Sequence, residues 1–287
     1  MKNINYLIQY IIIIFLFLIF KCIGHKIAIN LSGYIFTIFG PLFRSKKIIF
    51  NNFDKVFPKI NIKQKKRLLK EMWFGYGQIF SEYVFIKKFR DSKKFRQKII
   101  IKNKEILNQI KLDKEPVIFI SGHFNNFELM AQSIELYGID LATVYRPLNN
   151  KLLNPIMENI RKKYICKNQI KKGISGTKKL LQYFKKNTSV AMMIDQRVSE
   201  GINVDFFGQK ALTTTIPAQF VKKFKSKIVP VHIERTKENK FIITFFKPLV
   251  FLETNSIREI TLQLNKLLEK MIMINPSQWI WTHNRWK

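Results

Sequence analysis

The sequence contains few of the residues and motifs that mark several common classes of protein. Its two cysteines, Cys22 and Cys166, have no CxxC or other metal-binding spacing, so the sequence predicts neither a disulfide framework nor a metal site. It has no internal repeat, no P-loop and no GxGxxG pattern, which disfavours solenoids and the common nucleotide-binding folds. It also has no GxSxG serine, so a covalent acyl-enzyme is not indicated.

Acidic residues are scarce as well. The 287 residues include 19 Asp and Glu against 51 Lys and Arg, which gives a net charge of +32 at pH 7. Such a charge attracts nucleic acid, acidic proteins, phosphorylated lipids or a membrane surface. The abundance of Lys, Ile, Asn and Phe is also what an AT-rich genome produces, so the charge alone does not select a partner. With 47% hydrophobic residues, the chain can form one large folded core.

The N-terminal region contains an apolar run, Ile4–Phe20. Its length lies at the lower end of the ~17–25 residues that cross a bilayer as a helix. No small-residue cleavage site follows, and Lys21 before Cys22 does not suit lipoprotein-type cleavage, which favours an uncleaved anchor over a signal peptide. Lys2 is the only charged side chain before the run, and several basic residues follow it. The positive-inside rule therefore predicts a single-pass anchor with the body of the protein in the cytoplasm.

A second apolar run, Ile27–Phe43, is interrupted by polar residues, glycine and proline. It predicts an interfacial or partly buried helix, although a hairpin of two membrane spans stays open at this point. We therefore divide the chain into an anchoring and interfacial segment, residues 1–43, and a main domain, residues 44–287.

The main domain alternates short apolar runs with segments of helical periodicity. Strands are expected near Ile99 and at Val117–Ile120, Leu141–Val144, Val190–Ile194, Ile228–Ile233 and Phe241–Phe246. Helices are expected at Lys46–Pro58, Ile62–Ile86, Lys151–Lys163, Thr177–Lys185, after a capping Thr215, and at Ile257–Ile274. A polar loop is expected before Val204. This alternation predicts an α/β fold with a central, mostly parallel or mixed sheet flanked by helices.

One stretch, Val117–Tyr137, has the pattern of a buried strand, a tight turn and a helix. Asn125 can cap the helix, Glu128 occupies the capping-box position, and Gly138 ends it. On one continuous helix His123 and Glu128 would lie roughly 140° apart. With His123 in the turn, the Glu128 carboxylate can reach back to the imidazole ring and fix its tautomer. The alternative is that Glu128 only caps the helix and His123 is only a turn residue.

Polar side chains also follow two later strands. Arg146 ends the second strand of this part of the chain, and Asp195 and Arg197 follow the third. The carboxyl ends of parallel strands lie at one edge of a sheet, so we expect these groups to approach His123. Such a set suits removal of a proton from a hydroxyl beside an anionic group. Arg197 has the alternative role of pairing with Asp195.

The remaining histidines are not expected to be catalytic. His25 lies beside the anchor and is expected at the membrane interface. His232 lies within an apolar strand and is expected to be structural. His283 lies in a tryptophan-rich tail that docks either on the core or on the membrane interface, where tryptophan is favoured.

Eight ordered segments give the chain a resemblance to a known family: NNFDKVFP, EMWFGYGQIFSEY, SGHFNNFEL, YRP, DQR, VDFFGQKALTTT, PVHIER and PSQWIWTHNRWK. The chain resembles the late lipid A acyltransferases of the lauroyl and myristoyl type, within the wider superfamily of lysophospholipid and glycerolipid acyltransferases. The resemblance covers nearly the whole chain, including the anchor. The HxxxxE box of the family falls on His123 and Glu128, its arginine-proline box on Arg146 and Pro147, and its aspartate box on Asp195.

The resemblance implies transfer of a fatty acyl group from acyl carrier protein to a hydroxyl of a lipid A precursor at the inner membrane, and the orientation predicted above puts this reaction on the cytoplasmic face. In this interpretation residues 44–287 form the acyltransferase domain, His123 is the general base and Glu128 orients it. Arg146, Asp195 and Arg197 are the candidate substrate-binding residues. The expected partners are acyl carrier protein, the lipid A precursor and inner-membrane lipids, with no nucleic acid, no metal and no cofactor beyond the acyl donor.

Two alternatives stay open. The first is an acyltransferase that acts on a phospholipid or another glycolipid. The second is a non-enzymatic basic protein that binds a membrane or nucleic acid through its charge, which predicts steeply salt-sensitive binding that does not depend on His123.

Overall fold

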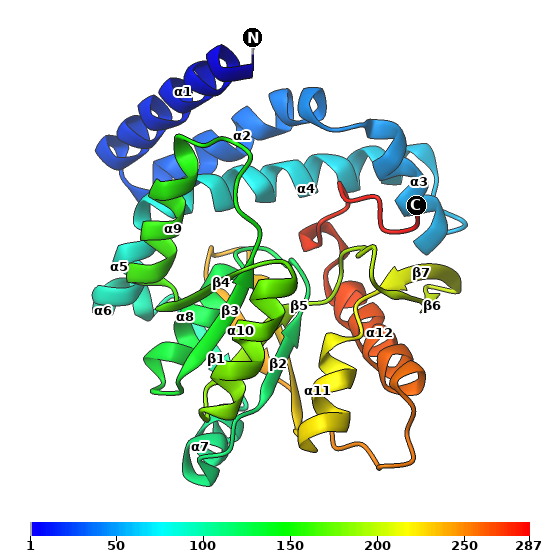
Figure 1. The fold of residues 1–287 in the computed structure, drawn as a ribbon. Coiled ribbons are helices and arrows are strands. Elements are labelled where there is room, and N and C mark those ends of the chain that lie inside the picture. The colour runs from blue at the N-terminus through cyan, green and yellow to red at the C-terminus, as the bar shows by residue number, and fades with distance from the viewer. Residues whose placement is uncertain (1) are drawn as a thin grey trace.

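The computed structural model describes residues 2–287 and begins with a series of helices. These are α1 (Lys2–Ile23), α2 (His25–Phe43), α3 (Lys46–Val56), α4 (Ile62–Glu82), the 3₁₀ turn η1 (Tyr83–Phe85), α5 (Ile86–Asp91) and α6 (Lys93–Arg96). Gly24 separates α1 from α2 with a φ of 80°, a left-handed conformation that glycine adopts without strain. In Figure 1, α1 lies at the outer edge of the molecule, while α2 and α4 run side by side across one end.

Within residues 2–287, two helices are long and apolar enough to cross a membrane by length and composition, α1 with a mean hydropathy of 2.4 and α2 with 1.3. They differ in burial, because α2 packs along α4. Gly77 of α4 faces the Ser32 carbonyl of α2 so closely that any Cβ there would overlap it. The two helices therefore form a close pair, as expected for a partly buried α2.

His25, at the start of α2, was expected at the membrane interface, and this prediction is wrong. The residue is buried, with only 8% of its surface exposed. Its ring contacts the rings of Phe85, Phe89 and Phe95, with centroids 5.1 to 5.7 Å away. Aromatic residues of η1, α5 and α6 therefore enclose the imidazole.

The core of the molecule is a seven-stranded sheet in the order β1-β9-β8-β2-β5-β3-β4. Its strands are β1 (Ile99–Lys102), β2 (Ile118–Ser121), β3 (Leu141–Tyr145), β4 (Asn168–Lys171), β5 (Ser189–Met193), β8 (Ile228–Arg235) and β9 (Phe241–Phe245). All neighbouring strands are parallel except β8 and β9. The prediction of a mostly parallel sheet flanked by helices is confirmed.

The remaining elements surround this sheet (Figure 1). They are α7 (Lys104–Asp113), α8 (Glu128–Leu136), α9 (Leu153–Tyr164), α10 (Ile174–Lys185), α11 (Ile216–Phe224), α12 (Ile257–Ile274), the 3₁₀ turn η2 (Pro276–Gln278), and the hairpin β6 (Ile202–Phe206) and β7 (Gln209–Thr213). The hairpin packs against α12, which in turn packs against α11.

Some local predictions are wrong. The segment before α11 forms the β6–β7 hairpin in addition to a loop, and β4 was not predicted. Both have few consecutive apolar residues, so their strand character comes from pairing with neighbours. Thr215 precedes α11 but makes no capping bond. Its hydroxyl accepts a hydrogen bond from Gln219 instead.

The C-terminal segment docks on the core. Trp281 and Arg285 are both fully buried. The Arg285 guanidinium lies 4.8 Å from the Phe206 ring centre and donates to the Thr213 hydroxyl. The Asn52 amide of α3 donates to the Trp281 carbonyl oxygen. These contacts fix the tail beside the carboxyl ends of the strands.

Candidate active site

His123 lies two residues beyond the end of β2, in the loop that leads to α8. Its backbone N–H donates to Asp195 Oδ2 at 2.8 Å. Asn125, in the same loop, has a left-handed φ of 35°, and its backbone N–H donates to the Gln278 carbonyl oxygen. The helix begins only at Glu128. The predicted capping box is therefore wrong, because Asn125 Oδ1 accepts from the Asn126 N–H instead.

Asp195 orients the His123 ring. Its Oδ1 lies 2.8 Å from His123 Nδ1, while Oδ2 also accepts from the Trp279 indole N–H at 2.9 Å. A carboxylate bonded to Nδ1 fixes the proton on that nitrogen and leaves Nε2 as the free base. Because the His123 side chain keeps 21% of its exposure and that of Asp195 keeps none, the carboxylate is sealed and the imidazole is reachable.

Burial and charge act against each other in this pair. Burial by itself lowers the pKa of His123, but the Asp195 carboxylate, with a smaller contribution from Glu128, raises it above its ordinary value. Burial raises the pKa of Asp195, but the His123 ring and the bonds from His123 and Trp279 bring it below its ordinary value. The structure therefore favours an imidazole that accepts a proton readily and a carboxylate that stays ionised.

Glu128 does not make the predicted hydrogen bond to His123. Its Oε1 accepts from the Tyr83 hydroxyl at 2.6 Å and from Arg161 Nε at 2.8 Å. Arg161 Nη2 also donates to the Tyr83 hydroxyl at 3.2 Å. Burial by itself lowers the pKa of Arg161, but the charges of Glu128 and Tyr83 and the hydrogen bonds to both together raise it above its ordinary value. Glu128 therefore belongs to a second polar group, and it acts on His123 only through its electrostatic field.

The strand order explains why His123 pairs with Asp195 and not with Glu128. Strand β5 is paired directly with β2, so Asp195 and His123 emerge side by side at the carboxyl ends of adjacent strands. The sequence predicted this convergence, but it did not identify Asp195 as the partner of the ring. It also missed Tyr83, Arg161 and Trp279. Arg161 lies in the basic helix expected at Lys151–Lys163, and no local signal distinguishes it from the neighbouring lysines.

A cavity of about 380 Å³ opens beside His123. The last registered pair between β3 and β5 is Thr143 with Ala191. Both strands continue beyond that pair, so the sheet separates at this point. The apolar part of the cavity wall includes Phe119, Phe127, Met130, Ala131, Ile134, Val144, Leu180, Met192, Met193, Ile216 and Val231. Such a wall suits an apolar ligand.

The polar part of the wall includes three basic groups. Arg161 lies beside Glu128, and the exposed side chains of Arg146 and Lys172 also line the cavity. Arg197 is placed elsewhere. Its Nε donates to the carbonyl oxygen of Lys287, and its N–H donates to His283. The suggested pair between Arg197 and Asp195 is therefore not formed.

The other two histidines near the site differ from His123. His232 is buried against the Phe124 ring, at 4.8 Å between centroids, and burial lowers its pKa to about 4. His283 accepts a hydrogen bond from the Arg197 N–H at 3.0 Å. Neither lines the cavity described above.

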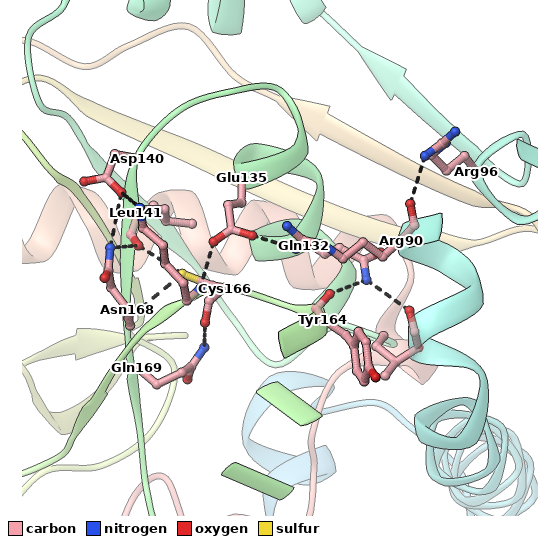
Figure 2. Close-up of polar contacts among 12 residues, drawn as sticks. Arg90, Arg96, Gln132, Glu135, Asp140, Leu141, Tyr164, Cys166, Asn168 and Gln169 are labelled. Carbon is pink, nitrogen blue, oxygen red and sulfur yellow. Dashed lines mark hydrogen bonds and ion pairs between the residues drawn. The ribbon is translucent and has the colours of Figure 1, made fainter. Parts of the chain in front are cut away.

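Polar contacts also hold the far end of α8 (Figure 2). Glu135 accepts from Arg90 Nη1 at 2.6 Å and from the Lys167 N–H at 2.8 Å. The Gln132 amide donates to the carbonyl oxygens of Ile86 and Tyr164. Helix α8 is therefore held separately at its two ends, by Glu128 at its first residue and by Gln132 and Glu135 toward its last.

The arrangement can perform one kind of chemistry directly. The His123–Asp195 pair has the geometry of the base and its orienting carboxylate in hydrolase triads, without an attached serine. An external hydroxyl placed in the cavity can take the position of that serine. The site therefore suits attack of a substrate hydroxyl on an activated carbonyl.

Comparison with known proteins agrees with this chemistry. The sequence model of a family described as bacterial lipid A biosynthesis acyltransferase matches residues 1–287, the whole chain. A lipid A biosynthesis acyltransferase of Haemophilus influenzae is 24% identical over 273 residues, which are 94% of this chain and 84% of that protein.

Two proteins of Escherichia coli are similar to about the same degree. A lipid A biosynthesis palmitoleoyltransferase is 22% identical over 247 residues, and a lipid A biosynthesis lauroyltransferase is 23% identical over 248 residues. Each match covers 85% of this chain and 79% of the relative.

Proposed function

Since this chain belongs to the bacterial lipid A biosynthesis acyltransferases, an O-acyltransferase family, we propose that it transfers a fatty acyl chain from acyl carrier protein to a hydroxyl of a lipid A precursor. The observation that carries the proposal is the His123–Asp195 pair at the mouth of a largely apolar cavity. A base beside an apolar chamber suits a reaction that joins an acyl chain to a hydroxyl.

In the proposed reaction His123 Nε2 takes the proton of the acceptor hydroxyl while its oxygen attacks the thioester carbonyl carbon. The new C–O ester bond forms, the C–S bond breaks, and the proton passes from the imidazolium to the leaving thiolate. Asp195 stabilises the imidazolium and holds its orientation. The atoms balance without an added cofactor, and a base placed in this way contributes roughly 10²–10⁴-fold.

Glu128 and Arg161 have a separate role in the proposal. The Glu128 carboxylate holds the Arg161 guanidinium in the cavity wall and adds negative charge near His123. A fixed guanidinium can stabilise the negative charge that develops on the carbonyl oxygen during attack. This assignment replaces the direct Glu128–His123 contact that the sequence predicted.

We propose that the apolar cavity holds the acyl chain. Ala131 of α8 is the smallest side chain that this helix contributes to the wall. A larger residue at this position would shorten the space available to the chain. The variant Ala131→Phe is therefore expected to shift the preferred donor to shorter acyl chains in a competition among donors of different length.

The charge of the chain suits both proposed substrates. Arg146 and Lys172 lie at the exposed part of the cavity, and a guanidinium can bind two phosphate oxygens at once. Acyl carrier proteins are acidic, and the acceptor carries phosphates, so both approach a strongly basic surface favourably. We keep Arg146 as a proposed substrate contact and assign Asp195 and Arg197 to positioning.

We propose that α1 crosses the inner membrane and that α2 lies in the membrane interface. Helix α1 exposes apolar side chains along its length. Helix α2 packs one face on α4 and exposes an opposite face of large apolar residues: Ile27, Leu31, Tyr34, Ile38, Phe39, Leu42 and Phe43. Protease should digest the body of the protein in inside-out vesicles and spare it in right-side-out vesicles; the reverse result would contradict the orientation.

A reconstituted assay tests the function. Purified full-length protein is given acyl carrier protein loaded with chains of several lengths, together with a lipid A precursor or a phospholipid, and product masses are read out. The proposal expects the precursor to gain the mass of one acyl group, and His123→Ala to lose nearly all of this product at equal reaction time. Acylation of phospholipid alone would change the assigned acceptor, and no acylation of either would refute the proposal.

A further inference from the structure

A second ion pair, enclosed by protein, is bonded to the catalytic loop, residues 122–127. Glu82 ends α4 and Arg235 ends β8. Arg235 Nη1 and Nη2 donate to the two Glu82 oxygens at 2.8 and 2.7 Å. The Glu82 side chain is fully buried, and that of Arg235 is 5% exposed. Neither residue lines the cavity beside His123, so substrate in that cavity would not touch the pair.

The pair is joined to the catalytic loop by Asn126. The Asn126 amide donates to Glu82 Oε2 at 2.9 Å, and the residue is only 2% exposed. Asn126 lies between His123 and Glu128 in the chain, so this bond restrains the short segment that carries both. It follows directly after Asn125, whose left-handed backbone is a conformation that surrounding contacts must maintain.

A second connection runs from Arg235 through the C-terminal segment. The Arg235 N–H donates to Gln278 Oε1 at 2.7 Å, and the Gln278 amide donates back to the Arg235 carbonyl oxygen at 2.9 Å. The Gln278 carbonyl oxygen accepts from the Asn125 N–H at 2.8 Å. Both asparagines of the loop are therefore held by groups that Glu82 and Arg235 organise.

The other side of the pair reaches the anchoring helices. His25 Nε2 lies 3.4 Å from Glu82 Oε1, an electrostatic contact longer than a normal hydrogen bond. The Lys98 ammonium lies 3.1 Å from His25 Nδ1. An ammonium only donates, so Nδ1 accepts and the proton sits on Nε2, facing Glu82. Glu82 is thus a junction between the first residue of α2 and the catalytic loop.

We propose that Glu82 is a positioning residue, which fixes the loop carrying His123 through Asn126 and ties that loop to helix α2. The inference rests on the proposed acyl transfer for its kinetic readout. Substrate does not contact the junction, so loosening it lowers the turnover number and leaves substrate binding largely unchanged. Misplacement of a reacting group by about 1 Å can cost up to roughly 100-fold in rate.

The test compares two single variants with a matched control. Asn126→Ala removes only the bond between the loop and the junction, and Glu82→Gln changes the junction itself. The control Glu135→Gln weakens a different ion pair, between Glu135 of α8 and Arg90. This pair lies at the end of α8 that is far from the loop (Figure 2). We expect kcat to fall about 10- to 100-fold in Asn126→Ala and Glu82→Gln with KM within about twofold. In the control, both constants should stay within about twofold.

A double variant separates positioning from loss of fold. The combination of Glu82→Gln with Asn126→Ala should be no slower than the slower single variant, because both act through one contact. Unchanged kcat in Asn126→Ala, or a rise in KM without a fall in kcat, would overturn the proposal.

Hydrogen exchange gives a readout that does not depend on activity. Amide exchange in the peptide spanning residues 121–129 should accelerate in Asn126→Ala and stay unchanged in Glu135→Gln. If the wild-type protein acylates no substrate but this exchange pattern is found, the proposed function fails and the positioning role stands. If this peptide exchanges at the same rate in Asn126→Ala as in Glu135→Gln, the positioning role is contradicted, whatever the activity.

Discussion

Two pairs of opposite charge involve residues of the same loop, 122–127, and they differ in what they face. His123 and Asp195 meet at the carboxyl ends of β2 and β5, where the His123 side chain keeps 21% of its exposure beside a cavity. Glu82 and Arg235 are closed off, with side chains 0% and 5% exposed. The first pair has a nitrogen free for proton transfer, whereas the second has its oxygens filled by protein donors.

The comparison shows that burial and charge pairing do not by themselves mark a catalytic site. Both pairs contain a carboxylate with charge-assisted bonds, and in both the pKa of the carboxyl group lies below its ordinary value despite burial. The two pairs differ in whether a substrate can reach them. Chemistry is expected at the open pair, and structural restraint at the closed pair.

Removal of the base should have the largest effect. His123→Ala is expected to reduce acyl transfer toward the upper end of roughly 10²–10⁴-fold, since the acceptor proton loses its recipient. Initial rates with saturating donor and acceptor measure the loss. Thermal unfolding in detergent should change little, because the ring is partly exposed and lines a cavity. Turnover near the wild-type rate would remove His123 from the mechanism.

Neutralising the orienting carboxylate should be next in size. Asp195→Asn keeps the shape but removes the charge that holds the tautomer, and roughly 10²–10⁴-fold is expected to be lost from kcat. Glu128→Gln should lower kcat less than Asp195→Asn does, because Glu128 makes no hydrogen bond to the His123 ring. A larger loss of kcat in Glu128→Gln than in Asp195→Asn would reverse the assignment of roles.

The closed pair should dominate stability. Arg235→Met leaves the Glu82 carboxylate buried without its main partner and is expected to cost about 3–5 kcal/mol of unfolding free energy. Arg90→Met breaks the more exposed pair with Glu135 and should cost at most about 1 kcal/mol. Urea unfolding of both variants in the same detergent checks the difference. Equal losses would mean that the closed pair contributes no more than a surface pair.

The smallest of these effects concerns the charged mouth of the cavity. Lys172→Glu should raise the KM for acyl carrier protein several-fold at low salt and leave kcat nearly unchanged. The effect should shrink as ionic strength rises, because exposed charges are screened over about 10 Å at 0.1 M salt. The exposed Lys210, which pairs with Asp205 on the β6–β7 hairpin, provides a control in Lys210→Glu. The same KM in both variants would argue against a carrier-protein contact at Lys172.

Most of the fold is predictable from local sequence patterns. The expected strands are all present, and α12 begins and ends at the predicted residues. Strand β4 and the β6–β7 hairpin escaped prediction, since their short segments contain few apolar residues and depend on pairing with neighbours. The burial of His25 escaped as well, because it depends on three phenylalanines from α5, α6 and η1 that are distant in the sequence.

The candidate site is less predictable than the fold. The sequence places His123, Arg146 and Asp195 at strand ends, and in the structure the ends of these three strands, β2, β3 and β5, lie beside the cavity. The sequence does not give the order of the strands, and only that order makes Asp195 the neighbour of His123. Glu128 is close to His123 in the chain, but α9 supplies Arg161 as a partner of opposite charge. Long-range packing therefore decided the pairing.

The pH dependence of kcat/KM tests the central claim, that Asp195 raises the proton affinity of the base more than Glu128 does. His123 acts when neutral, so the rate rises as pH passes upward through its pKa, which Asp195 holds above the ordinary value. Asp195→Asn should move this acidic limb to lower pH, and Glu128→Gln should move it less. An unmoved limb in Asp195→Asn, or a larger shift in Glu128→Gln, would contradict the account.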